Sequence, residues 1–287
     1  MIVRVPGSSA NLGPGFDTLG MALSVYAEIG SFDPAAPDEV PDGARAIDGH
    51  HPATVAHRAA GGQGPLWERC SIPVGRGLGY SGAVRVGGAM LARAQQRARQ
   101  RDGQAVTDTD RYDVLSIVAQ LEGHADNAAA SLFGGVVATA DNRVVNVPLR
   151  MDPAIVVWIP PFVTKTEESR RVLGAPVPFD DVVFNLGRLA VLIAALASGD
   201  TASLRAGVED RLHQPMRLLQ AEASRAAIDA AQQAGAWAAW LSGSGPTVAA
   251  MCAVSEADHV AAALPADGQT KVLRIDHEGA ATVDTYT

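Results

Sequence analysis

The chain has 287 residues, of which 47% are hydrophobic, and a formal net charge of -8. This length and apolar content suffice for one large domain or two modest ones. The acidic balance argues against a general nucleic-acid binder, which needs a basic surface, but it allows a locally electropositive pocket. Two widely separated cysteines, Cys70 and Cys252, predict neither a disulfide framework nor a zinc site, so we expect a protein of the reducing cytoplasm.

No membrane partner is expected from the apolar segments. The N-terminus from Met1 to Pro6 lacks a basic stretch followed by a long apolar run, so it does not resemble a secretory signal. The apolar run from Val182 to Ala197 is interrupted by Asn185 and Arg188 and is too short to span a bilayer. The pattern therefore predicts a soluble protein, and a homodimer is compatible with it.

The first part of the chain predicts strands around a loop of small residues. Ile2–Val5 alternates as a short strand, a loop follows over residues 6–17, and Leu19–Ile29 reads as a strand-like return. Residues 31–64 carry few order signals apart from a helix near Ala53 to Ala60.

Two helices are predicted next. Ala83–Arg101 places its apolar residues on one stripe with arginines opposite, and Arg111–Glu122 repeats an apolar pattern. Asp108 or Asp110 is suited to be the N-cap of the second helix.

A strand–helix order restarts near Arg150, so we predict two domains, 1–150 and 151–287. Just before the boundary, two short strands pair around an Asp141–Asn142 turn. Beyond it we expect a strand at Ile155–Ile159, helices at Asp180–Ser198 and Pro215–Ala234, and strands at Trp237–Leu241 and Thr247–Ala253.

The most informative local pattern is a strand end, a glycine loop and a helix within residues 70–101. The loop contains Gly75, Gly77, Gly79 and Gly82. Glycines let the backbone approach a ligand, and the helix that follows points unpaired N–H groups at the loop. This arrangement favours a polyphosphate cradle, in which the hydroxyl of Ser81 can bind Mg²⁺ or a phosphate oxygen.

Other interpretations of this loop are open at this point. A P-loop requires a lysine, which the loop lacks. The glycines match a dinucleotide fingerprint, but the next acid, Asp102, follows a long arginine-rich helix. On spacing alone, a plain flexible loop that enters a helix fits as well as a phosphate site.

Two further segments carry polar groups of interest. In residues 122–127, Glu122 can complete a Mg²⁺ shell, while His124 and Asp126 can hydrogen-bond a substrate hydroxyl or amine. In isolation this segment is more simply a capping turn, with Asp126 as N-cap. Residues 241–247 form a loop of small residues whose backbone can approach a phosphate or carboxylate, or which is a plain turn.

The order of these segments resembles the GHMP kinases. SSANLGPGFDTLG at 8–20 resembles their opening motif, PVGRGLGYSGA at 73–83 their second and LSGSGPT at 241–247 their third. EGHADN at 122–127, together with residues 166–173 and 210–217, resembles the homoserine kinases within this family. The resemblance covers nearly the whole chain.

The resemblance implies an α+β fold, with an N-terminal ribosomal-protein-S5-domain-2-like domain that carries the nucleotide loop and a C-terminal ferredoxin-like domain. It implies that ATP, with Mg²⁺, phosphorylates the side-chain hydroxyl of L-homoserine, a step of threonine biosynthesis. The implied partners are therefore ATP and L-homoserine, both small molecules.

The resemblance also implies roles for individual residues. ATP would contact Pro73, Val74, Gly75, Arg76, Gly77, Leu78, Gly79, Tyr80, Ser81, Gly82 and Ala83. The amino acid would contact Asn11, Asp17, His124, Asp126, Asn127, Arg170, Arg217 and Gly243. Mg²⁺ would bind Ser81 and Glu122, and the catalytic set would be Ser81, Glu122, Asn127 and Arg170. Asp17 suits an ammonium group, whereas the forked donors of Arg170 and Arg217 suit a carboxylate or phosphate.

Three residues depart from the usual GHMP pattern. Tyr80 and Gly82 replace a serine and an alanine of the second motif, and Asn127 stands where other members have a basic aspartate. Positioning and charge neutralisation can carry phosphoryl transfer without a strong base, with His124 and Asp126 as candidates for a proton relay. The alternatives are a GHMP kinase for another hydroxylated metabolite and a non-catalytic metabolite sensor, which Tyr80 favours and Ser81 with Glu122 opposes.

Overall fold

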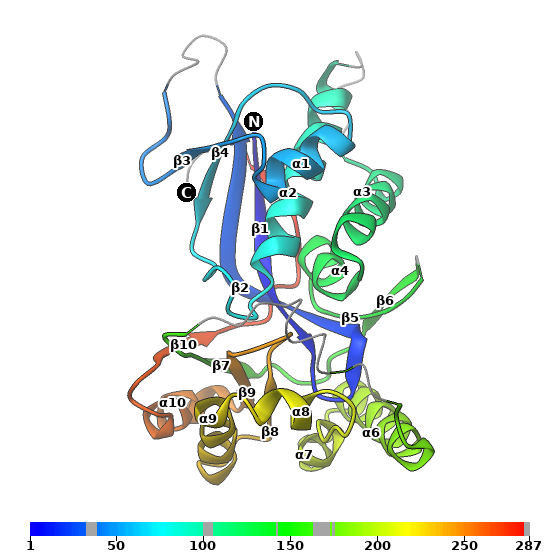
Figure 1. Ribbon diagram of the computed structural model, residues 1–287, viewed down its shortest axis with the longest axis vertical. Helices are drawn as coiled ribbons and strands as arrows, with labels where there is room; N and C mark the ends of the chain where they lie inside the picture. Colours follow the sequence, from blue (N-terminus) through cyan, green and yellow to red (C-terminus); the bar gives the residue numbers. More distant parts are fainter. Residues whose placement is uncertain (33–38, 100–105, 142, 163–172, 174–175, 284–287) are drawn as a thin grey trace.

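The computed structural model describes residues 1–32, 39–99, 106–141, 143–162, 173 and 176–283. Its framework is two sheets in which every pairing between described strands is antiparallel (Figure 1). The larger sheet has the order β11-β1-β2-β4-β3, with β5 pairing with β2 and β6. The smaller sheet has the order β10-β7-β9-β8. An α+β fold of the predicted kind is confirmed.

The strands have the following bounds. The larger sheet contains β1 (Ile2–Asn11), β2 (Gly15–Ser31), β3 (Arg45–Ile47), β4 (Leu66–Cys70), β5 (Val136–Ala140), β6 (Arg143–Val147) and β11 (Ala281–Val283). The smaller sheet contains β7 (Ala154–Ile159), β8 (Ala238–Leu241), β9 (Val248–Cys252) and β10 (Gln269–Leu273).

The helices group by sheet (Figure 1). Beside the larger sheet lie α1 (Pro52–Ala59), α2 (Tyr80–Arg99), α3 (Asp108–Glu122) and α4 (Asp126–Phe133). Around the smaller sheet lie α6 (Phe179–Ser198), α7 (Leu204–Gly207), α8 (Gln214–Leu218), α9 (Glu222–Gln233) and α10 (Ala257–Ala263), with short 3-10 turns at Thr201–Ser203 and Val254–Glu256.

The first strand is longer than its apolar pattern predicted. β1 continues to Asn11, so the prediction of a loop was wrong for residues 6–11. A register shift between Pro6 and Gly7 accommodates the proline in the strand, and Ser8 and Ser9 are fully buried. Sequence patterning missed this segment because small residues pack closely without giving an apolar alternation. The chain turns only at residues 12–14. Asn11, just before the turn, and Leu12, its first residue, both have positive φ.

Two helix starts also differ from expectation. α2 begins at Tyr80, within the glycine loop's motif, rather than at Ala83. The N-cap of α3 is Thr107, whose hydroxyl accepts from the backbone N–H of Asp110, while the Asp110 carboxylate accepts from the N–H of Thr107. The prediction of Asp108 or Asp110 as N-cap was therefore wrong, because Asp110 occupies the third helical position of a capping box.

The second half of the chain follows its predicted order with two differences. The expected helix at Pro215–Ala234 is two helices, α8 and α9, separated by a break over residues 219–221. β10 and β11 were not predicted, and β11 returns to pair with β1 in the larger sheet.

One apolar core runs through both sheets, and a second lies between the smaller sheet and helices α9 and α10. The domain boundary near residue 150 stays a prediction.

α6 is a long helix with an apolar composition. With 20 residues it is, by length and composition only, long and apolar enough to cross a membrane, and 22% of its apolar window is buried. The expectation that this run is too short was therefore wrong on length. Its polar residues are bound to the rest of the protein, however: Asn185 donates to Asp210 at 2.7 Å, and Arg188 pairs with Glu209 at 2.8 Å. These contacts tie the helix to the segment that precedes α8.

Candidate active site

Three segments that are far apart in the sequence, the end of β1 and two loops, meet at one cavity of about 480 Å³. The backbone N–H of Ser8 donates to the carbonyl of Leu78 at 3.1 Å, which joins β1 to the glycine loop. The hydroxyl of Ser242 donates to the carbonyl of Gly77 at 2.6 Å, and the N–H of Gly243 donates to the carbonyl of Ala10 at 3.1 Å. Each of the three motifs is thus hydrogen-bonded to the other two.

The glycine loop can pass between its neighbours only because side chains are absent. Gly77 and Gly79 have φ values of 77° and 70°, which favour glycine. A Cβ atom on Gly77 would lie 2.3 Å from the carbonyl oxygen of Ser242, and one on Gly79 would lie 2.1 Å from the hydroxyl of Ser8. The first turn of α2 follows directly, so its unpaired N–H groups and positive dipole end face the loop.

Tyr80 is held by a network around a buried carboxylate. Its hydroxyl lies 3.0 Å from Nε2 of His51, and that nitrogen lies 3.4 Å from Oε2 of Glu68. Burial alone would raise the pKa of Glu68, but hydrogen bonds from His51, Arg45 and Tyr80 hold that pKa at about 2. Burial and then Glu68 raise the pKa of Tyr80, so its phenol stays protonated and can donate. This network ties the start of α2 to strands β3 and β4.

Ser81 and Glu122 form an oxygen-rich corner of the cavity. The hydroxyl of Ser81 donates to Oε1 of Glu122 at 2.7 Å, although the two residues are 41 positions apart. Hydroxyl and carboxylate oxygens are the ligands that Mg²⁺ prefers, so the donor set fits this ion. Arg85, one helical turn after Ser81, hydrogen-bonds to both of these oxygens.

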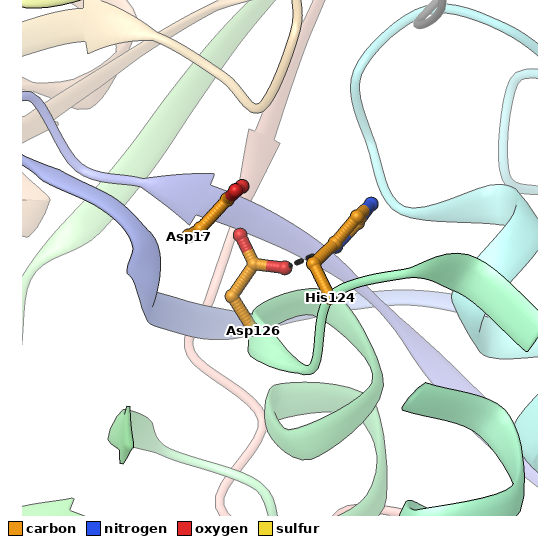
Figure 2. A group of neighbouring side chains, drawn as sticks. All are labelled: Asp17, His124 and Asp126. Atoms are coloured by element: carbon orange, nitrogen blue, oxygen red, sulfur yellow. Dashed lines mark hydrogen bonds and ion pairs between the residues drawn. The ribbon is translucent and has the colours of Figure 1, made fainter. Parts of the chain in front are cut away.

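Asp17, His124 and Asp126 form an acidic corner of the cavity. Their ligand atoms all lie within 4.8 Å of one another. Figure 2 shows one carboxylate oxygen of Asp126 bound to His124, at 2.6 Å from Nδ1, and the other turned toward Asp17. Asp17 has a φ of 54°, and its N–H donates to the side chain of Asn11 at 3.0 Å. A non-glycine residue held in this conformation is typical of a functional position.

Asn127 lies between the acidic corner and the glycine loop. Its side-chain oxygen accepts from the hydroxyl of Ser8 at 2.9 Å. The expected N-cap role of Asp126 is not observed, because α4 starts at Asp126 itself and Ala125 is the cap residue. The carboxylate of Asp126 instead accepts from His124 and from the N–H of Asn127 at 2.8 Å.

Arg217 reaches the cavity from α8 as a buried side chain, 6% exposed. It contacts Nδ1 of His213 at 3.0 Å and the carbonyl of Gly243 at 3.2 Å. Nε2 of His213 donates to the carbonyl of Gly13 at 2.7 Å, which leaves Nδ1 as the acceptor for Arg217. Burial lowers the pKa of His213, so the ring is neutral and this tautomer persists at neutral pH.

Most of the residues expected from the sequence line this one cavity. They are Asn11, Asp17, Val74, Gly75, Arg76, Gly77, Gly79, Tyr80, Ser81, Gly82, Glu122, His124, Asp126, Asn127, Arg217 and Gly243. Leu78 and Ala83 are buried in the core instead, where they support the loop, and Pro73 is not among the lining residues that the structure describes. Arg170 lies outside the described residues. Phe16, Arg85 and Leu121 also line the cavity and were not predicted.

The comparison of folds gives the class of protein. A family model described as the C-terminal part of GHMP kinases matches residues 192–270. The crystal structure of homoserine kinase from Cytophaga hutchinsonii superposes with a TM-score of 0.81, at 22% identity, covering 99% of this chain and 97% of that one. The fold is therefore that of the GHMP kinases.

Sequence relatives give the family within that class. The homoserine kinase of Moorella thermoacetica is 40% identical over 268 residues, which cover 88% of this chain and 87% of the relative. A homoserine kinase of Thermus thermophilus is 37% identical over 286 residues, covering 94% of each chain. The chain belongs to the homoserine kinase family.

Proposed function

We propose that this protein transfers the terminal phosphate of ATP to the side-chain hydroxyl of L-homoserine. The observation that carries the proposal is a single cavity lined by a glycine loop, by an acidic corner and by a buried arginine. This charge pattern complements a polyphosphate beside a zwitterionic amino acid. The named activity of the family relatives supports the same substrates.

The nucleotide phosphates are assigned to the glycine loop and the first turn of α2. Backbone N–H groups at a helix start bind anions without a lysine, and the loop has none. Gly77 and Gly79 keep the backbone exposed to the cavity, while the network of Tyr80 holds the helix start in place.

Mg²⁺ is assigned to Ser81 and Glu122. The two oxygens lie 2.7 Å apart on the side of the cavity next to the loop, which suits ligands of one small, hard cation. When bound there, Mg²⁺ would offset the negative charge of the phosphates during transfer.

The amino acid is assigned to the acidic corner and to Arg217. An ammonium group has three N–H donors. The carboxylates of Asp17 and Asp126 have oxygen atoms within 4.8 Å of each other, so both can accept from the same ammonium group. Arg217 is suited to the substrate carboxylate, since His213 and the carbonyl of Gly243 fix its fork. These two anchors would place the substrate hydroxyl near Asn127, between the acidic corner and the glycine loop.

Proton removal in this site needs only a weak base. Asn127 is an amide and does not take up a proton at neutral pH, so we infer that it orients the hydroxyl rather than deprotonating it. With Nδ1 of His124 donating to Asp126, Nε2 is the ring nitrogen that can accept a proton from the hydroxyl. A loose transition state releases the proton late, which makes positioning the larger contribution.

The decisive test is ADP release with ATP, Mg²⁺ and L-homoserine, compared with L-serine and L-threonine. We expect turnover that depends on the amino acid and is at least tenfold faster with L-homoserine. Turnover with another hydroxylated metabolite instead would reassign the substrate. Binding of ATP without ADP release under any condition would favour a metabolite sensor.

Two broader expectations accompany the function. Both cysteines are free, as expected in a reducing compartment, and we propose that the protein acts in the cytoplasm. A homodimer remains a prediction that sedimentation can test.

A further inference from the structure

Arg85 lies where the two proposed metal ligands meet. It follows Ser81 by four residues, so both side chains project from the same face of α2. One guanidinium nitrogen, Nη1, hydrogen-bonds to the hydroxyl of Ser81 and to Oε1 of Glu122. The side chains of Arg85 and Glu122 are 19% and 12% exposed, so this ion pair is largely shielded from solvent.

The donors of Arg85 are only partly used. Both contacts to Ser81 and Glu122 come from Nη1, whereas Nε is buried and has no hydrogen-bond partner among the described residues. A planar fork with an unused buried donor is suited to a further acceptor. Arg85 lines the cavity together with Gly75 and Gly82, so that acceptor can be a ligand bound there.

The other two arginines that line the cavity are bound to groups other than the two proposed metal ligands. Arg76 donates to the carbonyls of Pro160 and Pro161 at 3.1 and 3.0 Å. Arg217 is held by His213 and Gly243, on the amino-acid side. Arg85 instead has partners that are themselves oxygen ligands for a hard cation, so binding of that cation must change its contacts.

We propose that Arg85 holds the metal site in the nucleotide-free protein and binds the terminal phosphates of ATP once a divalent cation takes Glu122 and Ser81. The inference rests on the proposed assignment of the metal to these two residues. Oε1 of Glu122 and the Ser81 hydroxyl cannot accept the guanidinium and bind the cation at the same lone pairs. The displaced guanidinium remains in the cavity beside the glycine loop, where the phosphates lie and no lysine is present.

Competition for Glu122 is tested by binding of Mn²⁺ to the full-length, nucleotide-free protein, followed by electron paramagnetic resonance. Arg85→Met keeps most of the unbranched stem of the side chain but removes its charge and donors, and we expect it to bind Mn²⁺ about tenfold more tightly than the wild type. The gain should disappear in Arg85→Met/Glu122→Gln. Arg93→Met is the matched control, because Arg93 lies about two turns further along α2 and pairs with Asp113.

The outcomes separate this inference from the metal assignment beneath it. If Glu122→Gln weakens Mn²⁺ binding but Arg85→Met binds no more tightly than the wild type, the metal site stands and the competition is refuted. If Glu122→Gln leaves Mn²⁺ binding unchanged in both backgrounds, the metal assignment itself is wrong. Thermal unfolding of each variant shows whether the fold is retained.

Phosphate binding is tested by calorimetry with the non-hydrolysable analogue AMPPNP at saturating Mg²⁺. We expect Arg85→Met to weaken binding about tenfold and Arg85→Lys to show an intermediate loss, since lysine keeps the charge without the fork. AMP, which lacks the terminal phosphates, should bind all three proteins within about twofold. An unchanged affinity of Arg85→Met for AMPPNP would overturn the phosphate contact.

Discussion

At the residue scale, the buried arginine of α8 depends on a neutral histidine for its position. His213 donates through Nε2 to Gly13 and accepts through Nδ1 from Arg217, so the tautomer of one ring sets the direction of the guanidinium. Phe16 lies beneath the same guanidinium, with 5.4 Å between its ring centroid and the carbon of the group. The resemblance predicted Arg217 for the substrate, but neither His213 nor Phe16 was assigned a role in the sequence.

Arg217→Lys should therefore damage use of the amino acid more than use of ATP. Lysine keeps a positive charge but cannot contact His213, Gly243 and a carboxylate with one planar fork. We expect KM for L-homoserine to rise at least tenfold while KM for ATP changes less than about twofold in steady-state assays. Arg205→Lys, on a side chain that donates to the carbonyl of Gln232, is the control. A rise confined to KM for ATP would move Arg217 to the nucleotide.

Tyr80, which replaces a serine of the second motif, contacts His51 in the network around Glu68. Tyr80→Phe removes the hydroxyl next to His51 and leaves the buried Glu68 network short of a donor. We expect the free energy of unfolding to fall by roughly 1 kcal/mol, measured by urea denaturation, with ATP affinity nearly unchanged. Tyr112→Phe, at an exposed tyrosine, should have no comparable effect. A loss of ATP affinity at unchanged stability would place the hydroxyl on the nucleotide.

At the element scale, hydrophobic periodicity found the elements whose packing depends on it and missed those that rely on small residues. The long helices α2 and α6 and the buried strand β7 were predicted because their apolar residues repeat with a clear period. The second half of β1 was missed because its residues are glycine, serine, alanine and asparagine. β11 has too few residues to give a pattern, and it is placed by pairing with β1.

The glycine loop belongs to this scale because its shape is set by contact with β1 and with the loop at residues 241–247. Gly77→Ala adds a Cβ that would lie 2.3 Å from the carbonyl of Ser242, at a φ of 77°. We expect ATP affinity to fall at least tenfold in calorimetry, since the loop must move away from residues 241–247.

Gly64→Ala is the matched control for this loop variant. Gly64 also has a positive φ, 97°, but no described atom lies within 4 Å of the added Cβ. Its expected effect is a loss of about 1 kcal/mol of stability with unchanged ATP affinity. If Gly77→Ala behaved like Gly64→Ala, the contact between the loops would not be needed for nucleotide binding.

At the scale of the whole molecule, stability should depend on pH through buried histidines. Burial lowers the pKa of His57 and of His213 below the ordinary value of 6.5. Below pH 6.5 these histidines therefore bind protons in the unfolded chain but not in the folded protein. The free energy of unfolding falls as the pH decreases from 6.5 toward the pKa values of the folded state. Glu68, with a pKa of about 2 against 4.5 when unfolded, acts in a separate window below pH 4.5.

The measurement is Tm between pH 5 and pH 8. We expect Tm to decline below about pH 6.5 in the wild type and to decline less steeply in His57→Gln, whatever the absolute stability of that variant. His259→Gln, at an exposed histidine, should keep the wild-type slope. An unchanged slope in His57→Gln would assign the pH dependence to other groups.

The sequence by itself determined the kinds of residues in the site and their order along the chain, because the glycine loop and the acidic segment 122–127 are local patterns. Only the tertiary structure decided which of them touch. Asp17 meets Asp126, and Ser242 closes on Gly77, because the antiparallel sheets bring segments more than a hundred residues apart together. The tertiary structure also placed Arg85 beside the proposed metal ligands. In the sequence, an arginine of an amphipathic helix is expected to face solvent, and only the fold shows that Glu122 lies next to it.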